Sequence, residues 1–432
     1  MRIRRWAQGK HPCYNPLLTE QLAAFITPSN AVIAGGIRVG IAKDETSTSS
    51  RFNWKALCGG PALDDCISKR QNNLTFLRLA AAYLVLVGHS WTLTLGLGHH
   101  DPFSELIRPN MPWHLGLPGI AVSMFFLFSG LLITRSYFQR NNLFHFLEAR
   151  ILRLYPALIV CVVICVFGIG LAQTTWSVDR FIAHKATENY LLHNTSLVFN
   201  IKFRLPGLFV DQPFKGVNGS LWTLPYEAWM YLCAAVLGVL TIFRRRWLFN
   251  LFFLTTFLLY GLDMGYPGLT GTKFERLGIF FLMGAFAYIN ARKVRLNPAL
   301  MVFFMAIAWL TADSPIYAVT GSAALAYTML VIGFSPWIRL PNMDTIGDFS
   351  YGTYLYAFPV QQTLIHQLES PKPWEICLLA LFIVTPVAMA SWYGVERPML
   401  RFKGRLSRKL DPRVWQRATR ERAKGGCPEP AE

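Results

Sequence analysis

Long, nearly uninterrupted apolar runs are the feature that most constrains how this 432-residue chain can fold. A bilayer has a hydrocarbon core about 30 Å thick, and a helix needs about 20 mostly apolar residues to cross it. Of the residues, 53% are apolar and 15% are charged, whereas soluble domains average roughly a quarter charged residues. We therefore expect an all-α polytopic membrane protein without a soluble globular core.

The apolar runs predict about ten transmembrane helices. Two of the runs, at Trp247 and Ala299, are short, so nine or eleven spans are alternatives. The ten segments are Leu74–Leu97, Pro118–Tyr137, Ile151–Gln173, Leu221–Phe243, Trp247–Leu262, Phe274–Ile289, Ala299–Leu310, Ile316–Phe334, Phe349–Leu368 and Trp374–Val395.

The distribution of basic residues predicts the orientation of these helices. Cytoplasmic loops of membrane proteins are enriched in Lys and Arg. With the N-terminus inside, the first and last outer loops hold only Arg108 and Lys372, while the long outer loop 174–220 is an exception. The pattern fits an even number of spans with both termini in the cytoplasm. The inner loops and tail hold Arg135, Arg140, Arg150, Arg153, Arg244, Arg245, Arg246, Arg292, Lys293, Arg295, Arg339, Arg401, Lys403, Arg405, Arg408 and Lys409.

The net charge of +18 does not indicate a nucleic-acid partner, because the basic residues lie beside apolar spans and form no recognition motif.

Three parts are expected: a poorly ordered cytoplasmic extension (1–70), a membrane domain (71–398) and a basic cytoplasmic tail (399–432). The cluster His99, His100 and Asp101 would need further ligands to bind a metal ion, so no metal site is expected.

Two ionisable residues share a face of the first predicted span. Arg78 and His89 are eleven residues apart, which is about 16 Å along one side of a helix. Charged groups inside a span cost roughly 2.5–3.5 kcal/mol on insertion scales and are functional candidates. Arg78 would lie near the cytoplasmic end and His89 in the outer half. The alternative is a structural histidine that packs between helices.

Further candidates occur in or beside four other spans. Glu227 lies at a depth similar to that of His89 and could orient its ring, or it could be stabilised by the helix N-terminus. Arg150 and Arg153 share a helix face at the cytoplasmic mouth, which suits either a phosphorylated ligand or simple membrane anchoring. Glu396 lies at the level of Arg78 and favours an ion pair. Arg276 is either a functional group or an anchor at a loop edge.

Six short elements follow one another over nearly the whole membrane part of the chain. They are Asn73–Ala81 with Gly88–Ser90, Val122–Thr134, Arg150–Pro156, Leu221–Glu227, Phe349–Tyr356 and Val395–Pro398. In this order they resemble the acyltransferase-three family of integral membrane acyltransferases, which includes bacterial O-acetyltransferases of surface glycans and Nod factors.

The resemblance implies an O-acyltransferase in the bacterial cytoplasmic (inner) membrane. Its donor would be cytosolic acyl-CoA, usually acetyl-CoA, and its acceptor a hydroxyl of a surface or secreted carbohydrate. The resemblance implies His89 as general base or acyl carrier, with Glu227 assisting. Arg150 and Arg153 would hold the CoA phosphates at the cytoplasmic mouth, and Arg78 would position either the helix of His89 or the donor. The alternative is a transporter or translocase of lipid-linked glycan that uses the buried charges as a relay.

Overall fold

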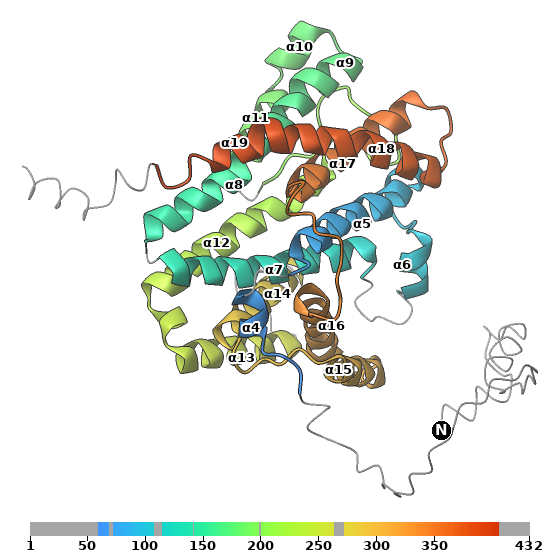
Figure 1. The fold of residues 1–432 in the computed structure, drawn as a ribbon. Coiled ribbons are helices and arrows are strands. Elements are labelled where there is room, and N and C mark those ends of the chain that lie inside the picture. The colour runs from blue at the N-terminus through green and yellow to red at the C-terminus, as the bar shows by residue number, and fades with distance from the viewer. Residues whose placement is uncertain are drawn as a thin grey trace, which may run out of the picture. The chain divides into compact units, whose positions relative to one another are not determined.

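A computed structural model describes residues 59–68, 72–107, 115–140, 142–197, 200–262 and 272–405 (Figure 1). In these ranges the chain forms helices and one isolated bridge between Ala62 and Arg295, and no strand. These residues belong to one unit of the chain, 53–432. Most of the expected N-terminal extension and tail, 1–58 and 406–432, lies outside the described residues.

Most of the helices follow one another with short connections, and the longer ones precede η3 and α17. They are α4 (Leu63–Ser68), α5 (Leu74–Leu95), α6 (Pro102–Ile107), α7 (Leu117–Arg140), α8 (Leu143–Val163), η2 (Ile164–Gly170), α9 (Leu171–Gln173), α10 (Val178–Ala183), α11 (Lys185–Ser196), η3 (Gly219–Thr223), α12 (Leu224–Val239), η4 (Ile242–Arg244), α13 (Arg246–Gly261), α14 (Thr272–Ile289), α15 (Pro298–Leu310), α16 (Tyr317–Phe334), α17 (Ser350–Gln367), α18 (Pro373–Ser391), η5 (Trp392–Glu396) and α19 (Arg397–Leu400).

Each of the ten segments predicted as a span lies on a helix of the structure. The largest difference is at the third, which begins at Leu143 and not at Ile151, because the Asn142 side chain caps the helix by accepting from the His145 N–H at 3.2 Å. Five helical stretches in the described part are long and apolar enough to cross a membrane. They are Leu74–Leu95, Leu117–Gln139, Leu143–Gln173, Tyr317–Phe334 and Pro373–Leu400.

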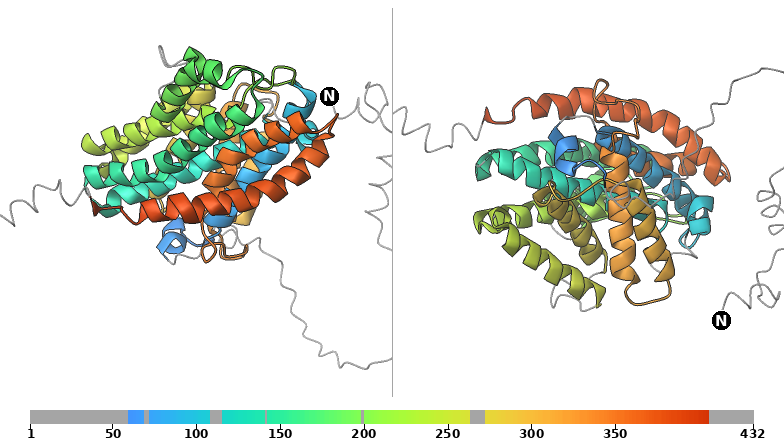
Figure 2. Two further views of the ribbon diagram at one scale, coloured as in Figure 1. Left: turned by 90° about the horizontal axis from the view of Figure 1, so that it is seen from above. Right: turned by 60° about the horizontal axis from the view of Figure 1, so that its bottom comes forward.

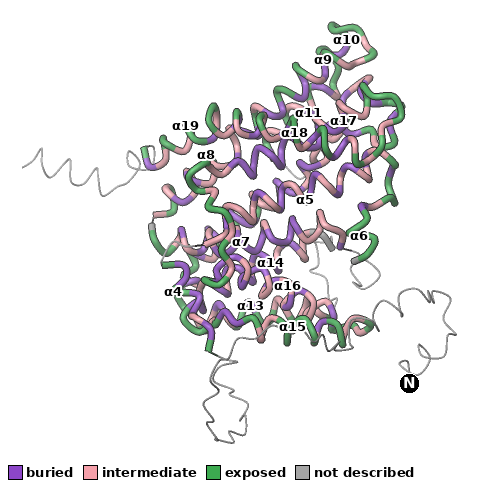
Figure 3. The backbone as a smooth tube through the Cα atoms, turned by 45° about the vertical axis from the view of Figure 1, so that its right-hand side comes forward, coloured by how far each residue is buried: buried purple, intermediate pink, exposed green. Residues whose placement is uncertain are grey.

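The helices differ in how much of their surface is buried (Figure 3). Twelve of the 18 residues of α17 are buried, so this helix is enclosed by its neighbours. In contrast, α15 buries only Ala308 and exposes large apolar side chains such as Phe303 and Trp309. Two views place α13 and α15 on one side of the bundle and α18 on the opposite side (Figure 2). Exposed apolar faces of this kind suit a lipid environment.

Glycines bring α7 and α14 into close contact. A Cβ at Gly130 would overlap the carbonyl oxygen of Phe281, and a Cβ at Gly284 would overlap that of Leu127. Small residues at a helix crossing let two backbones approach closely, which favours helix association in membranes. The crossing therefore requires glycine at both positions.

Buried polar side chains attach the loop before η3 to α17. The side-chain amide of Asn218 donates to the carbonyl of Leu355 at 3.0 Å, and its Oδ1 accepts from the Ser220 N–H at 3.1 Å. The side-chain amide of Gln362 donates to the carbonyls of Phe214 and Gly216, both at 2.6 Å. These bonds fix the start of α12, the helix that carries Glu227.

Part of the segment expected as an extension packs on the bundle. The Leu63 N–H donates to the carbonyl of Val294 at 2.9 Å, and the Leu296 N–H donates to that of Pro61 at 3.0 Å. The Leu63 side chain is fully buried. Residues 59–68 therefore pack against the turn that follows α14.

We expect Gly284→Ala to lower the stability of the protein by about 1–3 kcal/mol, the usual effect of overpacking. Thermal unfolding of the detergent-purified protein measures the change. The matched control is Gly168→Ala, whose Cβ would meet only the Ile164 side chain at 3.6 Å. Equal unfolding midpoints for the two variants would contradict the close crossing.

Candidate active site

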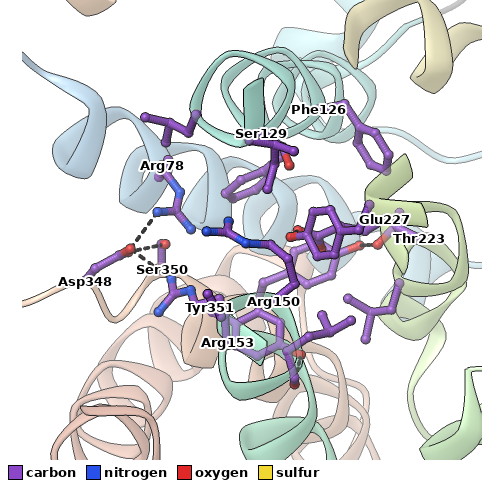
Figure 4. Close-up of a pocket in the computed structure, with 18 of the residues that line it drawn as sticks. Arg78, Phe126, Ser129, Arg150, Arg153, Thr223, Glu227, Asp348, Ser350 and Tyr351 are labelled. Carbon is purple, nitrogen blue, oxygen red and sulfur yellow. Dashed lines mark hydrogen bonds and ion pairs between the residues drawn. The ribbon is translucent and has the colours of Figure 1, made fainter. Parts of the chain in front are cut away.

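A cavity of about 300 Å³ lies among α5, α7, α8, α12 and α17, with basic side chains in its wall (Figure 4). Its four basic residues outnumber its two acidic residues, Glu227 and Asp348. In the close-up the guanidinium groups of Arg78 and Arg150 point toward one another. The basic residues are Arg78, Arg150, Arg153 and Lys403. This excess of positive charge favours an anionic ligand.

Asp348 connects two of these arginines. Its Oδ2 accepts from Arg78 Nη1 at 2.6 Å and from Arg153 Nη2 at 2.8 Å, and its Oδ1 accepts from Ser350 Oγ at 2.6 Å. The preceding Gly347 has a φ of +125°, a conformation that favours glycine. Burial alone would raise the pKa of Asp348, but Arg78, Arg153 and Ser350 lower it from 3.8 to about 2. The carboxylate is therefore ionised at neutral pH.

Arg153 has a second acidic partner. Glu396, whose side chain is 2% exposed, accepts from Arg153 Nη1 at 3.2 Å. An ion pair at Glu396 is thus confirmed, but its partner is Arg153, whereas Arg78 pairs with Asp348. Asp348 was not predicted as a site residue, because it lies in a loop just before the apolar segment that begins at Phe349.

Arg150 and Glu227 both contact Tyr231. The Arg150 guanidinium lies 5.9 Å from the centres of the Phe146 and Tyr231 rings. The Tyr231 hydroxyl donates to the Glu227 carboxylate. One of the two alternatives for Glu227 was a contact with the His89 ring, and no such contact occurs among the described residues. The carboxylate bonds to a tyrosine one turn along its own helix. Because α8 begins at Leu143, Arg150 lies in the third turn of that helix, and not at its entrance.

His89 lines a second cavity of about 70 Å³. Its Nδ1 is buried and has no hydrogen-bond partner in the described part of the chain, and its ring packs edge-on to Phe358 with centres 5.3 Å apart. The cavity's other lining residues are Val85, Pro118, Gly119, Val122, Trp222, Arg276 and Tyr354. The imidazole therefore has a nitrogen available to a ligand.

The two cavities are neighbours, because Val122 and Tyr354 line both. The Tyr354 hydroxyl bonds to Thr223 Oγ1 at 2.7 Å and to the Ser220 carbonyl at 2.9 Å, which holds its ring in place. Arg78 lines the larger cavity and His89 the smaller one, so the face of α5 that these two residues share borders both cavities. The arrangement fits an enzyme that binds an anionic substrate beside a reactive imidazole.

No metal centre is apparent in the part of the chain that the structure describes, where no three His, Cys, Asp or Glu side chains are grouped as ligands. In the loop after α5, Asp101 is buried, and its Oδ1 accepts from the Ser104 N–H at 2.8 Å. This carboxylate therefore caps α6.

Comparison with known proteins identifies the class. Residues 71–393 match the family model of the acyltransferase domain, the acyltransferase-three family, and the chain belongs to this family. The resemblance found in the sequence is therefore confirmed: the protein is an acyltransferase and an integral membrane protein. This result favours an enzyme over the transporter alternative.

Two relatives cover most of the chain. An O-acetyl transferase of Shigella phage Sf6 is 27% identical over 358 residues, which is 79% of this chain and 98% of the relative. Nodulation protein 10 of Rhizobium leguminosarum bv. viciae is 27% identical over 376 residues, which is 78% of this chain and 95% of the relative. No solved structure matches the chain.

We expect Asp348→Asn to lower the stability of the protein by about 2 kcal/mol, since hydrogen bonds to charged groups contribute roughly 1.5–3 kcal/mol. Because the folded-state pKa is depressed, this stabilisation is present above pH 3.8 and is lost as the pH falls through about 2. Unfolding measured at several pH values should thus show the gap between wild type and variant closing in this window. Asp344→Asn, an exposed change in the same loop, is the control; a gap independent of pH would argue against the ion pairs.

Proposed function

We propose that the protein is a membrane O-acyltransferase that moves an acyl group, usually acetyl, from cytosolic acyl-CoA to a hydroxyl of a surface or secreted carbohydrate. The observation that carries this proposal is the contact between the two cavities, one rich in arginine and one that contains His89. The family membership supports the acyl transfer. One relative is named an O-acetyl transferase, which supports acetyl as the group and a hydroxyl as the acceptor. The carbohydrate follows from the family resemblance.

The donor's phosphates would bind in the larger cavity. Guanidinium groups pair well with phosphate, because their donors form a rigid fork. Arg150 and Arg153 on α8 and Arg78 on α5 are the proposed binding residues. Asp348 holds two of them in place through ion pairs of 2.6 and 2.8 Å. The thioester end would then extend past Val122 and Tyr354 toward His89.

His89 would be the central catalytic residue. Its buried Nδ1 could accept the proton of the acceptor hydroxyl, or it could attack the thioester and carry the acyl group briefly. Glu227 is the second proposed catalytic residue. It would assist from the larger cavity, which it lines and where it accepts a hydrogen bond from Tyr231, without orienting the histidine ring directly.

The proposed setting is the bacterial inner membrane. About ten spans with both termini in the cytoplasm would place Arg78 near the cytosol and His89 in the outer half of the membrane. The two residues lie on one continuous helix, α5, about 16 Å apart along its axis. Such an enzyme could pass the acyl group outward while the charged part of the donor stays at the cytosolic side.

We expect His89→Ala to abolish acylation while the protein still reaches the membrane. Mass spectrometry would compare surface and secreted glycans from cells with the wild-type protein, with none, and with this variant. A loss of mass equal to one acyl group in both the null and the His89→Ala cells is the expected result. The control is His99→Ala, which removes an exposed histidine. Acylated glycans in His89→Ala cells would remove this residue from the catalytic role.

We expect Arg150→Met to raise the KM for acetyl-CoA by about 10-fold or more, because a charge-assisted hydrogen bond contributes roughly 1.5–3 kcal/mol. Initial rates of the purified enzyme with labelled acetyl-CoA measure this change. The matched control is Arg339→Met, since Arg339 is exposed in a loop outside the cavity. A KM unchanged from that of the control would argue against Arg150 as a donor-binding residue.

A further inference from the structure

Arg276 shares the small cavity with His89, and no role has yet been assigned to it. It lies in the second turn of α14, whereas His89 lies on α5. Its Nε is buried and has no hydrogen-bond partner among the residues that the structure describes. No acidic residue is among the described residues that line this cavity.

Placing a guanidinium group without a paired carboxylate in a cavity lined mostly by apolar and aromatic side chains costs free energy. Removing a charge from water costs several kcal/mol unless the group finds a partner. An anchor at a loop edge would keep its whole guanidinium in water, whereas Arg276 lines the space beside His89 and its Nε is buried. The position therefore indicates a ligand that carries, or develops, negative charge at this point.

The size of the cavity limits what can bind between the two residues. It holds about 70 Å³, and a water molecule's share of liquid volume is about 30 Å³. There is room for a group of a few heavy atoms, such as a short acyl group. A carbonyl group inside it would lie close to both Arg276 and His89.

We propose that this cavity is the acyl-group site and that Arg276 donates hydrogen bonds to the carbonyl oxygen of the acyl group during transfer. The inference rests on the proposed function and assigns Arg276 as a further catalytic residue. Hydrogen-bond donors aimed at the oxygen that becomes negative are a major source of rate acceleration in acyl transfer.

The chemistry balances by either route. If His89 acts as a base, it takes the hydroxyl proton while the acceptor oxygen bonds to the carbonyl carbon. The carbonyl oxygen becomes negative beside Arg276, the C–S bond then breaks, and the CoA thiolate takes the proton from His89. If His89 carries the acyl group, its nitrogen attacks the carbonyl carbon, the C–S bond breaks and CoA leaves as a thiolate. The acceptor hydroxyl then attacks the acyl-imidazole, the C–N bond breaks, and the hydroxyl proton passes to the freed His89 nitrogen, from which the thiolate takes it. Arg276 stabilises the same oxygen in each step.

The test uses the purified full-length enzyme, acetyl-CoA with a labelled acetyl group, and surface glycan extracted from cells that lack the enzyme. We expect Arg276→Met to lower kcat by about 10²–10³-fold, as the loss of one oxyanion donor does. The KM for acetyl-CoA should stay within about twofold, because the phosphates bind in the other cavity. Arg276→Lys, which keeps the charge and a donor, should recover part of kcat.

A matched control is Arg292→Met, which removes an arginine that is 87% exposed in the turn after α14. A normal kcat for Arg276→Met would overturn the inference. Equal losses in the Met and Lys variants, together with lowered thermal stability, would also overturn it and make Arg276 structural. If His89→Ala is inactive while Arg276→Met is active, only this inference fails. If the wild-type enzyme transfers no label to glycan, the proposed function itself fails.

Discussion

The ion pairs at Asp348 hold together the arginine-lined wall of the larger cavity. The carboxylate lies in the loop before α17, yet it pairs with Arg78 on α5 and Arg153 on α8, at 2.6 and 2.8 Å. Three elements far apart in the sequence are therefore fixed to one another beside the larger cavity, which is lined by four basic residues. Glu396 adds a second pair to Arg153. Without these carboxylates the arginines would repel one another, and a polar cavity among apolar helices would be hard to maintain.

The same helix carries the polar groups of both cavities, and this explains how one chain can separate binding from transfer. Arg78 and His89 belong to α5, so the distance between them is set by the rise of the helix. Val122 and Tyr354 form the boundary, and Tyr354 is held by hydrogen bonds to Thr223 and Ser220. Under the proposed function, the anionic part of the donor binds on one side of this boundary and only the small acyl group is needed on the other.

Each of the ten apolar segments predicted from the sequence lies on a helix in the described part of the chain, because the length of an apolar run indicates a helix in a bilayer. The sequence also identifies Arg78, His89, Arg150, Arg153 and Glu227 as unusual, since charges are rare in spans. It could not identify Asp348, one of 24 acidic residues and located in a loop. Its importance depends on contacts with residues 195 and 270 positions away. The hydrogen bond between Tyr231 and Glu227 was not predicted for a related reason: equal depth in the membrane does not determine which side chains are in contact.

The crossing of α7 and α14 determines the geometry of the small cavity. Val122 lies eight residues before Gly130 on α7, and Arg276 lies eight residues before Gly284 on α14, which is about 12 Å of helix in each case. Both residues line the cavity, so the two helices run from it to the crossing in the same direction. Close packing at the glycines thus limits movement of the Arg276 backbone relative to Val122. A catalytic donor is effective when its position is fixed before the reaction, and a rigid crossing at the next two turns provides that restraint.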